Sequence, residues 1–123
     1  MKSALCCLLL VSLGGTASAH HAFSSDFDRN VTGTIEGVLT EVFYRNPHAH
    51  YFITVTKEDG TDEVWDAEGY ALGMMSRGGF SSDTLTVGER VKVFGNMGRN
   101  GRRMIAIQWL EKEDGTVLNI FGR

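Results

Sequence analysis

All four histidines of this chain fall in two close pairs, and imidazole nitrogen is a ligand that copper, nickel and zinc share. The first pair is His20 and His21, and the second is His48 and His50. Because His48 and His50 stand two positions apart in a β-rich stretch, their side chains are expected on one face of a strand. The pattern predicts a metal site built from both pairs, with copper as the favoured ion and nickel or zinc ranked below it.

The first pair follows a segment that has the three parts of a secretory signal peptide. Residues 1–3 carry a positive charge, residues 4–13 form an apolar run, and residues 14–19 are small or polar, with alanine in the last and third-last places. The run suits a signal core and is shorter than the roughly 20 residues that span a bilayer. We therefore expect a signal peptide at residues 1–19, a periplasmic or secreted protein, and no membrane anchor after cleavage.

The place of cleavage determines which nitrogen ligands the mature chain offers. A cut after Ala19 makes His20 the first residue, so that its free amine and its imidazole chelate together. One imidazole from the folded domain then completes a T-shaped site of three nitrogens, a histidine brace, which suits Cu(II) or Ni(II). A cut after Ala17 is also compatible with the sequence. It places histidine third, where amine, backbone amides and imidazole chelate the same ions.

Composition limits the other chemistry of the mature protein. Both cysteines, Cys6 and Cys7, lie in the signal segment, so neither disulfides nor thiolate ligands are expected. The formal net charge is −3, and cleavage removes Lys2 but no acid. Since nucleic-acid binding depends on clustered cations, an acidic exported protein is not expected to bind nucleic acid. The one cluster of arginines surrounds an Asn-Gly turn and is interpreted as solvated charge at a hairpin tip; it comprises Arg99, Arg102 and Arg103.

The mature chain of 104 residues, 123 less the first 19, is expected to form one domain. An N-terminal arm at residues 20–30 precedes a domain at residues 31–123. Strands are expected at residues 32–44, 49–56, 63–67, 90–94, 104–110 and 117–121, with a short helix within residues 69–77. Gly37 is expected to bend the first strand. This order is typical of a mainly β fold, a small OB-like barrel of five or six strands with one helix between strands three and four.

The fold class predicts where a ligand would bind. In OB barrels, the loop between strands one and two and the loop between strands four and five flank the common binding face. Here these loops are residues 45–48 and 96–103, which places His48 at the edge of the expected site. The same face supports a second hypothesis, in which the surface around Phe52 and Trp65 recognises a protein partner or another envelope ligand without a metal.

The sequence resembles an uncharacterised exported bacterial family of small proteins, a domain-of-unknown-function group. The matching residues are Ala19-His20-His21-Ala22-Phe23, Asn46-Pro47-His48-Ala49, Glu68-Gly69, Leu72, Arg77-Gly78, Leu85, Gly88 and Asp114-Gly115. The resemblance implies an exported single domain and brings no activity with it. The chain departs from the family pattern at His50, where an aromatic residue such as Trp is usual. His48 is therefore the stronger candidate for a ligand.

Catalytic machinery is not expected in this chain. Asp66 and Glu68 alternate on a strand and are interpreted as part of a solvated face, because no nucleophile accompanies them. The leading hypothesis is an exported protein that binds Cu(II) through His20 and His48, with His21 or His50 assisting. The metal-free binding module ranks second. A copper-dependent oxidase ranks third, since so small a domain offers little surface to bind a substrate.

Overall fold

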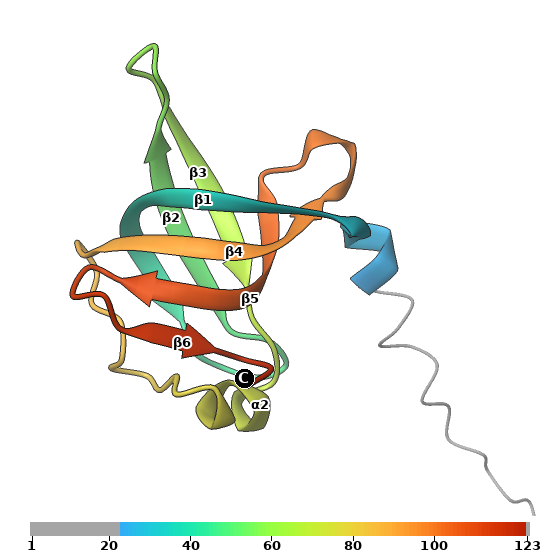
Figure 1. Cartoon of the computed structure of the whole chain (residues 1–123), viewed down its shortest axis with the longest axis vertical. Coiled ribbons are helices and arrows are strands. Elements are labelled where there is room, and N and C mark those ends of the chain that lie inside the picture. Colours follow the sequence, from blue (N-terminus) through green and yellow to red (C-terminus); the bar gives the residue numbers. More distant parts are fainter. Residues whose placement is uncertain (1–22, 123) are drawn as a thin grey trace, which may run out of the picture.

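The computed structural model describes residues 23–122, which form six strands and a short helix in the order expected from the sequence (Figure 1). A helical stretch at residues 23–26 leads into the first strand. The elements are β1 (Phe27–Phe43), β2 (His50–Thr56), β3 (Asp62–Glu68), α2 (Leu72–Arg77), β4 (Arg90–Gly98), a 3₁₀ turn (Arg99–Gly101), β5 (Met104–Lys112) and β6 (Val117–Asn119). The prediction of a mainly β fold with one helix between strands three and four is confirmed.

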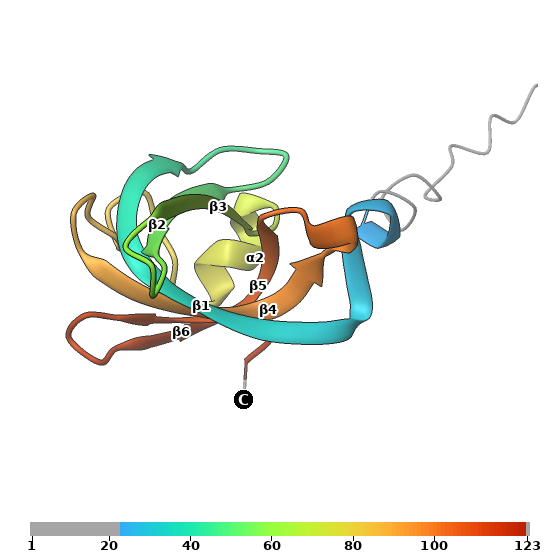
Figure 2. The same cartoon turned by 90° about the horizontal axis from the view of Figure 1, so that it is seen from above.

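The six strands form one sheet that curls into a closed barrel, as the view from above shows (Figure 2). The strand order is β3-β2-β1-β4-β5-β6, and every neighbouring pair in this order is antiparallel. A short parallel pairing closes the ring, in which Asp66, Ala67 and Glu68 of β3 stand opposite Met104, Ile105 and Ala106 of β5. The OB-type barrel predicted from the element order is confirmed by this closure, and β6 is a short addition to the edge of β5.

Alternation along the strands divides the side chains between the interior and the surface. In β2, Tyr51 and Ile53 are fully buried, whereas His50 and Phe52, which alternate with them, remain partly exposed. The helix α2 lies at one end of the barrel, where Met75 extends the core (Figure 1). Because burial of apolar side chains drives folding, this alternation fixes which face of β2 is left for other contacts.

The first strand is long because it bends and pairs with two neighbours in turn. Its first half pairs with β4 up to Val38, and its second half pairs with β2 from Val38 onward. A side chain at Gly37 would collide with the carbonyl oxygen of Thr54, so only glycine permits the close approach at the bend. The bend expected from Gly37 is therefore present, and it lets one strand serve both halves of the barrel.

The first strand begins earlier than the sequence pattern indicates. Residues 27–30, part of the N-terminal arm predicted at residues 20–30, belong to β1. Phe27 pairs with Gly98 of β4 and is almost completely buried. The polar run of residues 28–30 that follows Phe27 lacks the alternation of apolar and polar residues that marks a strand. The last strand ends at Asn119 rather than at residue 121. Among residues 23–122, no helix has the length and apolar character that crossing a membrane requires.

Candidate functional site

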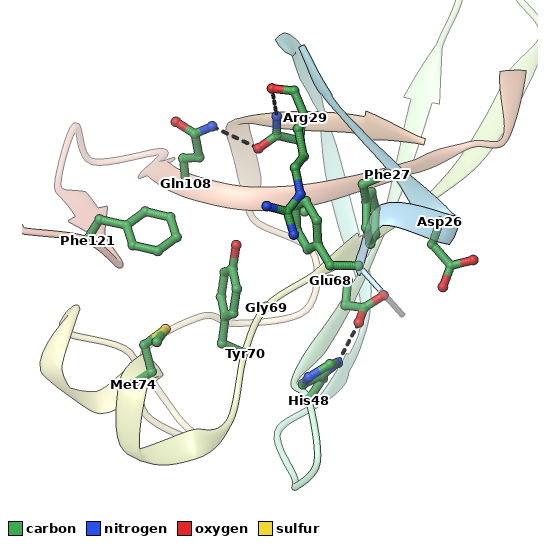
Figure 3. A pocket seen from close by; sticks show the side chains of 13 residues that line it. Asp26, Phe27, Arg29, His48, Glu68, Gly69, Tyr70, Met74, Gln108 and Phe121 are labelled. Atoms are coloured by element: carbon green, nitrogen blue, oxygen red, sulfur yellow. Dashed lines mark hydrogen bonds and ion pairs between the residues drawn. The ribbon is translucent and has the colours of Figure 1, made fainter. Parts of the chain in front are cut away.

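A pocket of about 750 Å³ opens where the N-terminal segment, the end of β3 and the C-terminal residues meet (Figure 3). Its volume falls within the roughly 300–1,000 Å³ of ligand sites. The lining residues are Phe23, Asp26, Phe27, Arg29, His48, Glu68, Gly69, Tyr70, Met74, Asn96, Ala106, Gln108 and Phe121. One of the histidines singled out from the sequence therefore lines the pocket, together with residues from both ends of the described chain.

Aromatic rings form much of the wall. Tyr70 and Phe121 meet edge to face with ring centroids 5.4 Å apart, and Phe23 and Phe27 lie 5.2 Å apart. The guanidinium of Arg29 lies over the ring of Phe23, 5.4 Å from its centroid. A cation over an aromatic face is attracted by the ring quadrupole, so this contact helps to place the Arg29 side chain at the pocket.

Two amides support the part of the wall that carries Arg29. Gln108 donates from Nε2 to Oδ1 of Asn96 at 3.0 Å. Asn96 donates from Nδ2 to the main-chain oxygens of Asp28 and Arg29, at 3.1 and 3.2 Å. This chain of hydrogen bonds fixes the start of β1 against β4 and β5. The wall that carries Arg29 is therefore rigidly tied to the barrel.

His48 and His50 project from one face, as predicted, and each meets a carboxylate of β3. His48 Nδ1 lies 2.6 Å from Oε1 of Glu68, and His50 Nδ1 lies 2.9 Å from Oδ1 of Asp66. The side chain of His48 is the more exposed of the two histidines, at 46% against 33%. A carboxylate on Nδ1 orients an imidazole and leaves Nε2 to bind a ligand.

The register of the β2–β3 hairpin brings these groups together. His50 stands opposite Glu68, so each histidine reaches diagonally to an acid on the same outer face. Next to His48, Ala49 donates its N–H to the Tyr70 carbonyl and accepts a hydrogen bond from Gly69 N–H at 2.7 Å. Backbone pairing thus fixes His48 beside the end of β3. The interpretation of the two acids as simple solvated charges is wrong, because both contact histidine.

The N-terminal segment is held in place by arginines from the β4–β5 turn. Arg99 donates from Nε to the main-chain oxygen of Ser24 at 2.7 Å and to that of Phe27 at 3.1 Å. Arg102 Nη1 lies 2.6 Å from Oδ1 of Asp26. The turn between strands four and five therefore fixes the path by which the chain enters the barrel.

This anchoring corrects the interpretation of the arginine cluster as solvated charge at a hairpin tip. Arg99 also approaches Asp28, at 3.6 Å, while Arg103 contacts Glu63 of β3 instead. Of the three arginines, Arg99 and Arg102 contact the segment at residues 24–28, and Arg103 does not. Residues 24 and 99 are 75 positions apart in the sequence, so no local sequence pattern predicts their contact.

His20 and His21 lie outside the described residues, so the predicted meeting of the two pairs is not tested. Within residues 23–122, no group of three or more His, Cys, Asp or Glu side chains is arranged to hold a metal ion. His48 and His50 are neighbours on one face, with separate carboxylate partners. Phe23, which follows His21 after one residue, lies in the wall of the pocket that His48 also lines.

Tyr70 reaches into the pocket with its hydroxyl group (Figure 3). Burial raises the pKa of Tyr70, and the nearby charge of Glu68 raises it further. The phenol therefore keeps its proton through the neutral range and serves as a hydrogen-bond donor. Among the described residues it has no hydrogen-bond partner.

The surface expected around Phe52 and Trp65 does not form. Phe52 lies on the outer face of β2, edge to face with Phe43 at 5.9 Å, whereas Trp65 packs against the core from β3. Trp65 stands opposite Ile53, which points into the barrel, whereas Phe52 is the next residue along β2 and points outward. Because successive side chains of a strand point to opposite faces, Trp65 and Phe52 lie on opposite faces of the sheet. The second tryptophan, Trp109, stacks on Phe94 with ring centroids 5.4 Å apart.

No protein of curated function matches this sequence. Among solved structures, the N-terminal domain of the PriB protein from Thermoanaerobacter tencongensis is similar in fold, with a TM-score of 0.50 and 18% sequence identity. The match covers 68% of this chain and 96% of that domain, and it supports the OB-type architecture alone. The family model of DUF6152 matches residues 8–106, most of the chain. The chain therefore belongs to DUF6152, a family of unknown function.

Proposed function

We propose that this protein is exported and binds a metal ion, with Cu(II) as the favoured ion. His20, as the first residue after cleavage of the signal peptide, supplies its amine and its imidazole, and His48 supplies a further imidazole. His21 or His50 assists. The protein acts in binding or carrying the ion rather than in catalysis.

The observation that supports this proposal is that Phe23 and His48 line the same pocket. His20 precedes Phe23 by three positions, a stretch of chain that reaches at most about 10 Å. Arg99 and Arg102 hold the segment that follows Phe23, so this end of the described chain is fixed at the pocket. The terminal imidazole that we propose as a ligand is therefore joined by a short tether to a residue of the pocket that His48 also lines.

The contact between His48 and Glu68 gives a second line of support. In metal sites, a histidine ligand commonly donates its other ring N–H to a carboxylate, which orients the ring and makes the ligating nitrogen more basic. Glu68 stands in that position relative to Nδ1 of His48, at 2.6 Å. Asp66 does the same for His50, at 2.9 Å. Both imidazoles thus direct Nε2 away from β3, as ligands of a metal would.

The donor set favours copper over the other ions. Nitrogen ligands in a planar or T-shaped arrangement suit Cu(II) or Ni(II), and the usual order of affinities places copper first. The only cysteines, Cys6 and Cys7, belong to the predicted signal peptide, so a zinc site built on thiolates has no donors in the mature chain. Bound copper would supply a Lewis-acidic, redox-active centre at the pocket rim.

The test uses the protein after export. The intact mass locates its first residue, and titration with Cu(II) against a competing chelator, followed by electron spin resonance, measures binding at nitrogen ligands. We expect tight binding of one ion, a loss in His20→Ala and His48→Ala, and a smaller loss in His50→Ala. Unchanged binding in both of the first two variants, or no binding stronger than that of the competitor, contradicts the proposal.

A further inference from the structure

The charges around the pocket are unevenly paired. Asp26 is neutralised by Arg102 at 2.6 Å, and Glu68 meets His48. Arg29 forms no ion pair with any residue among 23–122, although its side chain lines the pocket and points into it (Figure 3). Within the described residues, the pocket therefore presents one cation without a counter-charge.

We propose that this pocket binds a small amphipathic monocarboxylate, whose carboxylate meets Arg29 and whose apolar body lies between the aromatic walls. The proposal goes beyond metal binding and does not depend on it. The binding energy comes from two sources, an ion pair at Arg29 and the burial of apolar surface against Tyr70 and Phe121.

The guanidinium group determines the chemistry of the ligand's polar end. Its planar fork of N–H donors matches the two oxygens of a carboxylate, and its position over the Phe23 ring holds it in place. Arg102 and His48 are already engaged with Asp26 and Glu68, so among the described lining residues Arg29 alone is left to meet the charge of a ligand. A single carboxylate is therefore favoured over a phosphate group with two charges.

The walls determine the ligand's other end. The Tyr70 and Phe121 rings, the Phe23 ring and the thioether of Met74 together form an apolar surface. The hydroxyl of Tyr70 has no hydrogen-bond partner among the described residues and reaches the pocket, so it is placed to donate a second hydrogen bond to the bound acid. An aliphatic or aromatic body with one acidic end satisfies both parts of the pocket.

The test is calorimetric titration of the metal-free mature protein with octanoate, with 1-octanol and inorganic phosphate as comparison ligands. We expect saturable binding of one octanoate and weaker binding of the other two. Arg29→Gln should weaken octanoate binding roughly tenfold or more, as expected for a charge-assisted hydrogen bond, and leave octanol binding unchanged. Tyr70→Phe should weaken octanoate binding several-fold.

The matched control is Arg90→Gln, since Arg90 pairs with Glu36 on the surface of β1 and β4 and lies outside the pocket. An absence of saturable octanoate binding, an equal loss in Arg29→Gln and Arg90→Gln, or phosphate binding as tight as that of octanoate overturns the proposal. Circular dichroism of each variant establishes that the barrel is intact.

Metal binding and acid binding are separated by Arg29→Gln. We expect this variant to bind octanoate roughly tenfold more weakly and to bind copper within about twofold of the parent protein, because the proposed copper ligands are histidines and Arg29 is not among them. If the parent protein binds no copper but binds octanoate, only the proposed metal function fails. If it binds copper but not octanoate, only the pocket proposal fails.

Discussion

Nδ1 of His48 lies 2.6 Å from Oε1 of Glu68, a carboxylate that is itself mostly buried at the end of β3. An imidazole in this position is held by the barrel before any ligand arrives, because Glu68 belongs to the strand that closes the ring against β5. Through this pair, the barrel positions the histidine that we propose as a copper ligand. The first prediction tests the contribution of Glu68 to copper binding.

Glu68→Gln should weaken Cu(II) binding roughly tenfold to a hundredfold, as loss of a carboxylate behind a ligating histidine does in other metal sites. The barrel should stay folded, since the change removes a charge and keeps the shape of the side chain. Chelator competition measures the effect. Glu36→Gln, which alters an acid that pairs with Arg90 elsewhere, is the control and should leave the affinity unchanged. Equal affinities for the parent and Glu68→Gln would refute the role given to Glu68.

Arg99→Ala should loosen the segment at residues 23–28, because it removes two hydrogen bonds to main-chain oxygens. The free energy of local opening should fall by about 1 to 2 kcal/mol, measured by hydrogen exchange of the amides in that segment. Arg103→Ala is the matched control, since Arg103 contacts Glu63 instead. If both variants exchange alike, Arg99 does not anchor the entry of the chain.

Tyr51→Phe should leave the free energy of unfolding unchanged or raise it by up to about 1 kcal/mol. Tyr51 is 1% exposed, and its hydroxyl has no hydrogen-bond partner in the described part of the chain. Tyr44→Phe is the counterpart, because the Tyr44 hydroxyl donates to the Phe80 carbonyl at 3.0 Å and its loss should cost about 1 kcal/mol. Urea denaturation of both variants measures the difference, and a larger loss in Tyr51→Phe would contradict the prediction.

Alkaline pH should destabilise the barrel through the same side chain. Burial raises the pKa of Tyr51 above its ordinary value of 10.0, and the neighbouring Tyr44 adds to the effect. Above that ordinary value the unfolded chain releases the phenol proton while the folded chain retains it, so stability falls as the pH rises. Below it, both states are protonated and this contribution is fully present.

The measurement is urea denaturation at about pH 9 and about pH 11. The parent protein should lose stability between these values, and Tyr51→Phe should lose less. Tyr70, whose pKa burial also raises, contributes in the same direction and remains in the variant. Identical losses in the two proteins would show that Tyr51 is not the group responsible.

Gly37→Ala should destabilise the protein by about 1 to 3 kcal/mol or more, since the added methyl group collides with the Thr54 carbonyl at the bend of β1. Gly73→Ala is the opposite case. Gly73 lies in α2, where an added methyl group meets nothing within 4 Å, and alanine should stabilise the helix by roughly 0.5 to 1 kcal/mol. Denaturation midpoints measure both, and a tolerated Gly37→Ala would show that β1 does not need the close approach.

The order of elements could be predicted because each signal is local. Alternation in β2 and the Asp59-Gly60 turn define the hairpin, and that turn also fixes the register that sets His50 opposite Glu68. The two histidine–carboxylate contacts can therefore be predicted from the sequence by counting residues outward from the turn. From the strand pattern alone, Asp66 and Glu68 are interpreted as solvated instead, because acids in alternate positions of a strand usually are.

Other features depend on contacts between distant parts of the chain. Phe27 pairs with Gly98, and Arg99 bonds to the Ser24 carbonyl, so the start of β1 and its anchor are fixed by the far end of β4. The pocket unites Phe23 with Phe121, from opposite ends of the described residues. A local pattern of hydrophobic residues cannot predict such contacts, because they form only when the strands close into the barrel.

The closure of the ring by β3 and β5 also restricts how another macromolecule could approach the pocket. One edge of β5 pairs with β4, and the other is divided between β3 at residues 104–106 and β6 at residues 109–111. Strand addition requires an open edge, and β5 offers little of one. A partner that docks against β5 therefore meets side chains rather than a free row of backbone hydrogen-bonding groups.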